Sequence, residues 1–390
     1  MSLKPLPFCS GLEQYQKQAE ELLEAHRAGD PDAIRAIHEK HPRFLDSKIP
    51  WLPNNLPDSE IRNSAFDLAD AQLTIARWYD FRDWLALQEY VEAVTRENSP
   101  VAKFEMAVEA VISGDVGTLA SLLRENPELV RTRSTRITHF DPPVHRATLL
   151  HYVAANGVEG YRQKTPQNAV EVATMLLQAG AEVDSVADLY GGQCTTMALL
   201  VSSCHPAQAG VQVALTEALL DFGAAIEERG SGKWVSPLMT ALAFGYQSAA
   251  EALAKRGARV DNIGAAAGLG RLAEARQLLA TADRESRHRA LAIAAQHGHA
   301  DIVRLLLDAG EDPNRHNPDG NHSHSTPLHQ AVIAGHDAVV RLLVERGARL
   351  DIKDTIYQAT PLGWAIYGRQ SEIEKHLRAH GAKTAGELEQ

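Results

Sequence analysis

The stretch STPLHQA at residues 325–331 decides the fold of this 390-residue chain, because it returns as ATPLGWA at residues 359–365. The two copies start 34 positions apart, and each is followed by a glycine turn, an aliphatic stretch and a Gly-Ala pair. A fixed period of this size is the signature of a repeat architecture, in which one small unit is stacked many times.

Each copy predicts a pair of helices. Thr326 can cap the first helix, and Pro327 suits its first turn. The apolar residues that follow share one face at helical spacing, and Gly335 ends the helix. The second helix is expected over residues 337–345, with Gly347 as its end. A helix pair of this size is too small to fold alone, so it must stack on its neighbours.

The unit recurs toward the amino terminus with decreasing fidelity. Its motifs T-P-L-H, G-H-x-x-V-V-x-x-L-L and G-A are similar to those of the ankyrin repeat, and the chain resembles the bacterial ankyrin-repeat protein family from about residue 104 to residue 382. The resemblance implies an all-α fold, an ankyrin-repeat solenoid of stacked helix pairs with short hairpin fingers. We expect one continuous elongated stack over residues 101–390 and an amino-terminal helical cap over residues 1–100.

Composition and charge narrow the class of function. The net charge is −11, and the absence of a Lys/Arg-rich run disfavours nucleic-acid and membrane-surface binding. The amino terminus lacks the apolar core of a signal peptide, and no stretch reaches the ~18 apolar residues of a membrane span. Cys9, Cys194 and Cys204 are too few for a disulfide framework. We therefore expect a soluble, cytoplasmic protein.

The middle of the chain departs from the repeat period at two insertions and at two fingers. In an ankyrin-like stack these segments would form the two walls of one groove. Extra residues occur at 158–166 and 203–210, and polar and aromatic side chains fill the fingers at 139–146 and 188–194. One interpretation is the loop variation that surface segments tolerate. The other is a ligand-binding pocket. Its candidate residues are His139, His145, Glu159, Tyr161, Arg162, Lys164, Tyr190 and His205.

This pocket favours a binding function. The resemblance implies a binding module, and a walled groove favours a peptide, a protein segment or a small molecule. Cationic side chains favour an anionic group on the small ligand, and aromatic side chains supply contact surface. The cations are Arg146, Arg162 and Lys164, and the aromatic residues are Tyr161, Tyr190 and Trp234.

A later finger carries His322 and His324. Alternation in an extended backbone points both rings to one side, and two such His can bind zinc or another divalent metal if His316 or His329 supplies a third ligand. The alternative is that both are solvent-exposed finger residues. His329 itself occupies the last place of T-P-L-H, as His151 does in an earlier unit, and the resemblance implies structural hydrogen bonds for both.

Two further classes of function stay open. One is an unusual enzyme on the ankyrin scaffold, in which His, Tyr and Glu act as acid–base groups on a small molecule, with or without a His-bound divalent metal. The other is a purely structural assembly protein. The sequence assigns no catalytic residue and no cofactor, and we favour binding over catalysis.

Overall fold

The computed structural model describes residues 3–227 and 236–389, and these residues divide into two compact units. The first unit holds residues 3–224, and the second holds residues 225–227 and 236–389. The first unit therefore contains the residues predicted to form the helical cap together with residues predicted to form the first repeats. Trp234, one of the aromatic residues expected at the pocket, lies outside the described residues.

The amino-terminal part of the first unit is a group of helices around one apolar core. Its elements are α1 (Leu12–Ala28), α2 (Pro31–Lys40), the 3₁₀ turn η1 (Pro42–Phe44), α3 (Asp58–Asn63), α4 (Leu68–Trp78) and α5 (Trp84–Thr95). Aspartates begin three of these helices, and Asp83 accepts a hydrogen bond from the backbone of Ala86 at the start of α5. Asp30 accepts hydrogen bonds from the backbone of Asp32 and Ala33 ahead of α2, and Asp67 and Asp70 cap α4 reciprocally.

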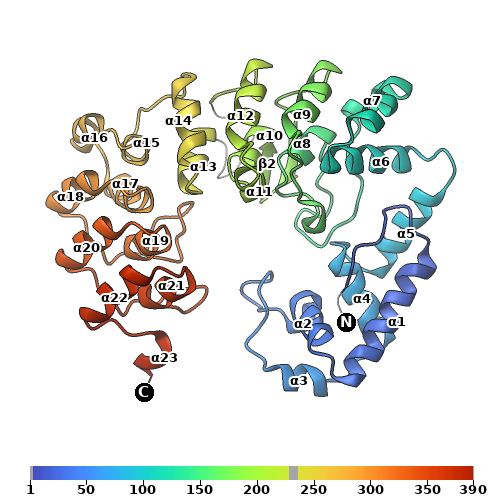
Figure 1. Cartoon of the computed structure of the whole chain (residues 1–390), viewed down its shortest axis with the longest axis horizontal. Helices are drawn as coiled ribbons and strands as arrows, with labels where there is room; N and C mark the ends of the chain where they lie inside the picture. Colours follow the sequence, from blue (N-terminus) through green and yellow to red (C-terminus); the bar gives the residue numbers. More distant parts are fainter. Residues whose placement is uncertain (1–2, 228–235, 390) are drawn as a thin grey trace. The chain divides into compact units, whose positions relative to one another are not determined.

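The rest of the first unit is a stack of helix pairs with irregular insertions. Its elements are α6 (Pro100–Ser113), α7 (Val116–Glu125), η2 (Pro127–Arg131), α8 (Leu149–Val153), η3 (Gly160–Arg162), α9 (Ala169–Gln178), β1 (Val186–Leu189), β2 (Gly192–Thr195), α10 (Thr196–Leu200), α11 (Cys204–Gln208) and α12 (Gln212–Asp221). The first helices α6, α8 and α10 lie side by side, and so do α7, α9 and α12 (Figure 1). The extra residues predicted after α8 and α10 form η3 and α11.

One finger of the first unit is a regular β-hairpin. Strands β1 and β2 pair antiparallel from Val186↔Thr195 to Leu189↔Gly192. The two residues between them, Tyr190 and Gly191, have φ values of 54° and 74°. Two positive φ angles are what a two-residue type I′ turn requires, and this turn matches the twist of the strands. The hairpin therefore holds Tyr190 at its tip.

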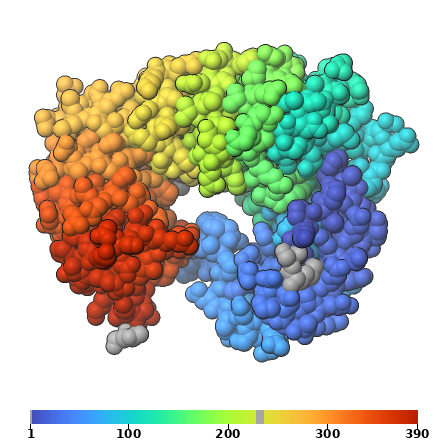
Figure 2. Space-filling view, viewed as in Figure 1, coloured from blue at the N-terminus to red at the C-terminus, as the bar shows by residue number. Residues whose placement is uncertain are grey.

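The second unit continues the repeat in two layers of helices. Its elements are α13 (Pro237–Ala243), α14 (Gln247–Lys255), α15 (Ile263–Gly268), α16 (Leu272–Leu279), α17 (Arg284–Gln296), α18 (Ala300–Asp308), α19 (Pro327–Ile333), α20 (Asp337–Glu345), α21 (Pro361–Tyr367), α22 (Ser371–Ala379) and α23 (Ala385–Leu388). The odd-numbered helices from α13 to α21 contact one another in order and form one layer. The even-numbered helices from α16 to α22 do the same in the second layer (Figure 1). The orange and red repeats pack as one continuous body (Figure 2). The expected all-α solenoid is confirmed.

The histidines of the repeat motif are structural. The Nδ1 atom of His329 lies 2.8 Å from the Thr326 hydroxyl at the start of α19, and its Nε2 lies 3.2 Å from the carbonyl of Ala359 in the next repeat. The Nδ1 atom of His151 lies 2.8 Å from the Thr148 hydroxyl at the start of α8. These rings fix the helix starts, as the resemblance implies.

The repeats that begin with α15 and α17 lack long fingers. The finger of a later repeat lies where theirs would be. Helix α15 is built from glycine and alanine apart from its first residue, so α13 and α17 approach closely enough for Gln296 to donate to the carbonyl of Ala243 at 3.1 Å. The finger between α18 and α19, residues 314–325, reaches the same carbonyl, because His322 Nε2 lies 2.8 Å from it. The carbonyl at the end of α13 is thus satisfied by side chains from two later repeats.

Among the described residues, no helix is long and apolar enough to cross a membrane.

Candidate functional site

A cavity of about 230 Å³ opens between two fingers and an insertion of the first unit. The finger 138–146 contributes one wall, the hairpin of β1 and β2 contributes another, and the segment after α8 contributes the third. The lining residues are Phe140, Asp141, His145, Gly157, Val158, Gln163, Asp188, Leu189 and Tyr190.

Short hydrogen bonds fix these walls against one another. The backbone N–H of Asp188 donates to the carbonyl of His145 at 2.7 Å, which joins the two fingers. The Tyr190 hydroxyl donates to Asn156 Oδ1 at 2.6 Å, which joins the hairpin to the end of the first helix of the unit. Gly157 has a φ of 70°, and a Cβ there would lie 3.0 Å from Leu189 Cδ1. Glycine is therefore needed where the insertion passes under the hairpin.

His145 supplies an acceptor in the wall of the cavity. The Thr138 hydroxyl donates its one proton to the carbonyl of Pro143 at 3.0 Å, so at 3.2 Å it must accept from His145 Nε2. Burial lowers the pKa of His145 below its usual value, which favours the neutral ring. A neutral ring protonated at Nε2 leaves Nδ1 as a bare acceptor. That atom is buried and has no hydrogen-bond partner among the described residues.

The other polar groups of the cavity are also acceptors. Asp141 and Asp188 bring carboxylates, which accept hydrogen bonds and do not donate them when ionised. The side-chain donors are largely engaged, because one N–H of the Gln163 amide donates to the carbonyl of Val158 at 2.9 Å and the Tyr190 hydroxyl donates to Asn156. The remaining walls are apolar. The arrangement is suited to a cationic, donor-rich group with an apolar stem.

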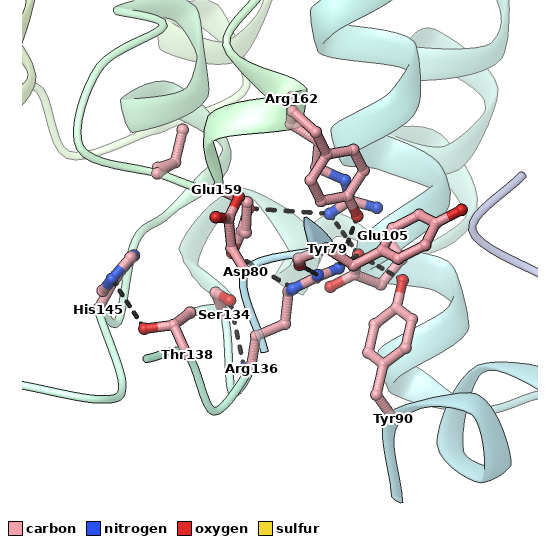
Figure 3. Close-up of polar contacts among 12 residues, drawn as sticks. Tyr79, Asp80, Tyr90, Glu105, Ser134, Arg136, Thr138, His145, Glu159 and Arg162 are labelled. Atoms are coloured by element: carbon pink, nitrogen blue, oxygen red, sulfur yellow. Dashed lines mark hydrogen bonds and ion pairs between the residues drawn. The ribbon is translucent and has the colours of Figure 1, made fainter. Parts of the chain in front are cut away.

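The insertion that lines the cavity also enters a buried ionic cluster, which we define as Glu105, Arg136, Glu159 and Arg162 (Figure 3). All four side chains are 1% exposed. Two cations and two carboxylates balance one another. Arg162 donates from Nη1 to Glu105 at 2.5 Å, and Arg136 lies 3.5 Å from Glu159 and 3.7 Å from Glu105. A balanced set of this kind is retained because each charge compensates another in a medium of low polarity.

Tyrosines complete the cluster as neutral donors. Burial and the nearby carboxylates raise the pKa of Tyr90 and Tyr152 well above the usual value. Both hydroxyls therefore stay protonated. Tyr90 donates to Glu105 at 3.1 Å and Tyr152 donates to Glu159 at 3.4 Å. Burial alone would lower the pKa of Arg162, but Glu105 and other neighbours raise it above its usual value, so the guanidinium stays charged.

The cluster joins the helical cap to the first repeats. Arg136 donates from Nη2 to the carbonyl of Tyr79 at 3.0 Å and lies 4.1 Å from the ring centre of Phe81. Next to it, the backbone N–H of Gly160 donates to Asp80 Oδ2 at 2.6 Å. The hydrogen bond to Asp80 thus fixes the insertion after α8 against the segment between α4 and α5. This contact positions one wall of the cavity.

The structure divides the residues expected at the pocket into three groups. His145 and Tyr190 line the cavity. Glu159 and Arg162 belong to the buried ionic cluster, and the Tyr161 hydroxyl accepts a hydrogen bond from Arg136 at 3.1 Å. The remaining three are away from the cavity lining. His139 lies 3.3 Å from Asp80, Lys164 is exposed, and His205 lies on the short helix α11.

The candidate residues predicted from the sequence did not include Asp141 and Asp188, which carry the charge of the cavity. Both lie in the two fingers that the sequence predicted to line the groove, so the segments that carry them were predicted. The direction of each side chain was not, because it depends on a hairpin register and a hydrogen bond between two fingers.

The expected metal ligands lie in the second unit, and their rings are engaged elsewhere. His322 Nε2 bonds the carbonyl of Ala243, and His324 Nδ1 lies 3.7 Å from Asp354 Oδ1. His329 bonds Thr326 and Ala359. Across residues 3–227 and 236–389, no group of three or more His, Cys, Asp or Glu side chains has the arrangement of a metal site.

Comparison with known proteins identifies the repeats. A family model described as ankyrin repeats (three copies) matches residues 291–385. The chain is 37% identical over 103 residues to Ankyrin repeat and SAM domain-containing protein 6 of Mus musculus, which covers 26% of this chain and 11% of that protein. It is 31% identical over 220 residues to Ankyrin repeat and KH domain-containing protein mask-1 of Caenorhabditis elegans, which covers 54% of this chain and 8% of that protein.

The chain therefore spans about a tenth of the length of these two relatives. Both are animal proteins, so they support the repeats and not the bacterial origin that the resemblance implies. Among solved structures, the ankyrin repeat domain of human ASB11 matches with 21% identity and a TM-score of 0.37, over 71% of this chain and 98% of that one.

Proposed function

We propose that this chain, which contains ankyrin repeats, is a binding module that holds a segment of a partner protein at the finger cavity of its first unit. A Lys or Arg side chain of that segment would enter the cavity. The observation that carries the proposal is that both charged residues of the lining, Asp141 and Asp188, are carboxylates, and that His145 Nδ1 is a further acceptor with no hydrogen-bond partner among the described residues.

The size of the cavity supports one side chain as its occupant. A volume of about 230 Å³ is below the range of roughly 300–1,000 Å³ that is typical of sites for drug-sized molecules. Phe140, Val158 and Leu189 supply apolar contacts for the methylene stem of a long cation, whose charged end would then meet the carboxylates. The peptide or protein segment predicted from the groove is retained in this proposal.

This proposal replaces the small anionic ligand that the cations of this region predicted with a cationic side chain. Arg162 is bound by Glu105 and lies 3.1 Å from Glu109, so its charge is already neutralised inside the protein. Arg146 and Lys164 are exposed and do not line the cavity. Nothing among the described residues favours the acid–base enzyme, and we do not propose it.

The test is retention of the full chain on immobilised capped peptides that differ only in a central Lys, Arg, norleucine or Glu. The wild type is expected to prefer Lys and Arg by at least about tenfold, because charge-assisted hydrogen bonds contribute roughly 1.5–3 kcal/mol each. The double variant Asp141→Asn/Asp188→Asn should lose this preference. The matched control is Glu128→Gln/Glu182→Gln, which removes the same charge from exposed positions outside the cavity.

Equal retention of all four peptides, or a preference for Glu, would contradict the proposal. So would a Lys preference that survives in the double variant, or one that the double variant and the control lose equally, since an equal loss would come from net charge.

A further inference from the structure

The second unit contains a larger cavity that the proposed function does not use. It measures about 310 Å³ and lies between the end of α13 and the finger 314–325. Its lining residues are Met239, Thr240, Ala243, Arg289, Asp319, Gly320 and Asn321. A neighbouring cavity of about 220 Å³ shares Ala243, Asp319 and Gly320 with it.

Asn321 sets this cavity apart. The residue is 1% exposed, yet neither its Oδ1 nor its Nδ2 has a hydrogen-bond partner among the described residues. Leaving one buried polar group unsatisfied costs roughly 1–3 kcal/mol, and here both ends of an amide are unsatisfied. In the same finger Asn317 is satisfied at one end, because its Nδ2 donates to Ser325 Oγ at 3.4 Å while its Oδ1 has no partner among the described residues. Such a group in a native fold needs an explanation, and a ligand is one.

The finger is held in place on both sides of Asn321. Arg289 donates from Nη1 to the carbonyl of Asp319 at 2.8 Å, and His322 Nε2 donates to the carbonyl of Ala243 at 2.8 Å. The backbone N–H of Asn321 itself donates to the carbonyl of Pro318 at 3.1 Å. The backbone that carries the amide is therefore fixed, which lowers the entropy cost of using it in recognition.

We propose that this cavity binds a carboxamide group, with Asn321 as its recognition residue. The side chain of Asn presents one acceptor and one NH₂ donor in a single plane, and an amide presents the complementary pair. A carboxylate would leave Oδ1 without a donor, and an ammonium would leave Nδ2 without an acceptor. The positive charge of Arg289 is already shared with Glu285, whose carboxylate lies 3.0 Å from Nη2, and the Asp319 carboxylate accepts from the backbone N–H of Gly320 at 3.1 Å. Both charged residues of the lining are therefore engaged, which favours a neutral group.

Two sources can supply this chemistry: the backbone of a peptide, which is a secondary amide, or a primary amide such as a glutamine side chain or a small free molecule. Met239 and Ala243 provide apolar contact for the substituents of either. The site is carried by residues of the second unit alone and does not depend on the proposed function of the first.

The test uses the full chain and three probes, N-methylpropionamide, methyl propionate and propionamide, with affinity measured by ligand-observed NMR. The wild type is expected to bind an amide about tenfold more tightly than the ester, which lacks the N–H donor, because each neutral hydrogen bond contributes roughly 0.5–1.5 kcal/mol. Preference for the N-methylamide identifies a peptide backbone as the source, and preference for propionamide identifies a primary amide.

The variant Asn321→Leu is close in size and removes both polar atoms. It should lose the amide preference while its thermal midpoint stays at or above that of the wild type, because an unsatisfied buried amide is removed. The control is Ser323→Ala, an exposed change on the same finger that should leave binding unchanged. Equal affinity for amide and ester, or equal amide binding by wild type and Asn321→Leu, would overturn the proposal. A lowered midpoint of the Leu variant would show that Asn321 is satisfied within the protein and would also overturn it.

Discussion

The buried ionic cluster of the first unit gives the sharpest stability prediction. Replacing Arg162 with Met keeps a long, flexible side chain but removes the charge that faces Glu105. Glu105 would then keep only Arg136 at 3.7 Å and the Tyr90 hydroxyl at 3.1 Å, while staying 1% exposed. Breaking one partner of a buried ion pair costs about 3–5 kcal/mol, since the other charge stays buried without compensation.

This magnitude is measurable by urea unfolding followed by far-UV circular dichroism. With an m value of about 1–3 kcal/mol/M, a loss of about 3–5 kcal/mol lowers the midpoint by roughly 1–5 M. Fluorescence of Trp78 and Trp84, which lie in the first unit, should follow the same transition. The double variant Arg162→Met/Glu105→Gln should be more stable than Arg162→Met alone, because its second change removes the uncompensated charge.

The matched control is Arg96→Met, which breaks a pair with Glu92 whose side chains are 69% and 75% exposed. That change should leave the midpoint almost unmoved, because solvent already screens both charges. If Arg162→Met lowers stability by no more than about 1 kcal/mol, the value for an exposed pair, the cluster is hydrated and our reasoning is refuted. A double variant less stable than the single one would refute it as well.

Three other predictions concern glycines and histidines. Gly268→Ala should lower stability by about 1–3 kcal/mol through overpacking, because its Cβ would lie 2.7 Å from both Ile293 and Leu242. Gly264→Ala, whose Cβ contacts are 3.2 Å, should lower stability less in the same urea titration. Gly157→Ala should weaken peptide retention at the finger cavity, because φ is 70° and the new methyl group would press on Leu189; unchanged retention would show that the hairpin can move. Burial lowers the pKa of His329 to about 4, so between pH 6.5 and pH 4 the unfolded chain binds a proton that the folded chain does not, and stability falls as the pH falls. His329→Asn should reduce the slope of stability against pH in that window by about 1.4 kcal/mol per pH unit; an unchanged slope would mean that the ring is protonated in the fold.

The repeat signal predicted the architecture well because it is local. Thr326, Pro327 and Gly335 act within one helix and its turn, so their spacing alone indicates where the helix begins and ends. The structure has α19 at Pro327–Ile333 and α20 at Asp337–Glu345, as this spacing predicts. The same local rule assigned His329 its hydrogen bonds within and between repeats.

The candidate site was predicted only as a region, because its side chains are placed by contacts that skip along the chain. Arg162 and Glu159 looked like surface ligands in an insertion, yet they meet Glu105 and Arg136 in a buried cluster. The ionic partner of Arg162 lies 57 positions away, and no local pattern pairs the two. The aspartates of the cavity were not among the candidate residues, because their place in the lining depends on a contact between two fingers.

The contact of His322 with the carbonyl of Ala243 also affects how the second unit can change in evolution. Repeat proteins usually gain or lose units easily, because each unit touches only its neighbours. Here the contact joins residues 79 positions apart, and the repeats between them have only short fingers. Deleting or duplicating a unit between them would move the finger 314–325 off its acceptor and open both cavities beside it. We therefore expect the repeats from α13 to α19 to be inherited as one indivisible block, with changes in repeat number confined to either side of it.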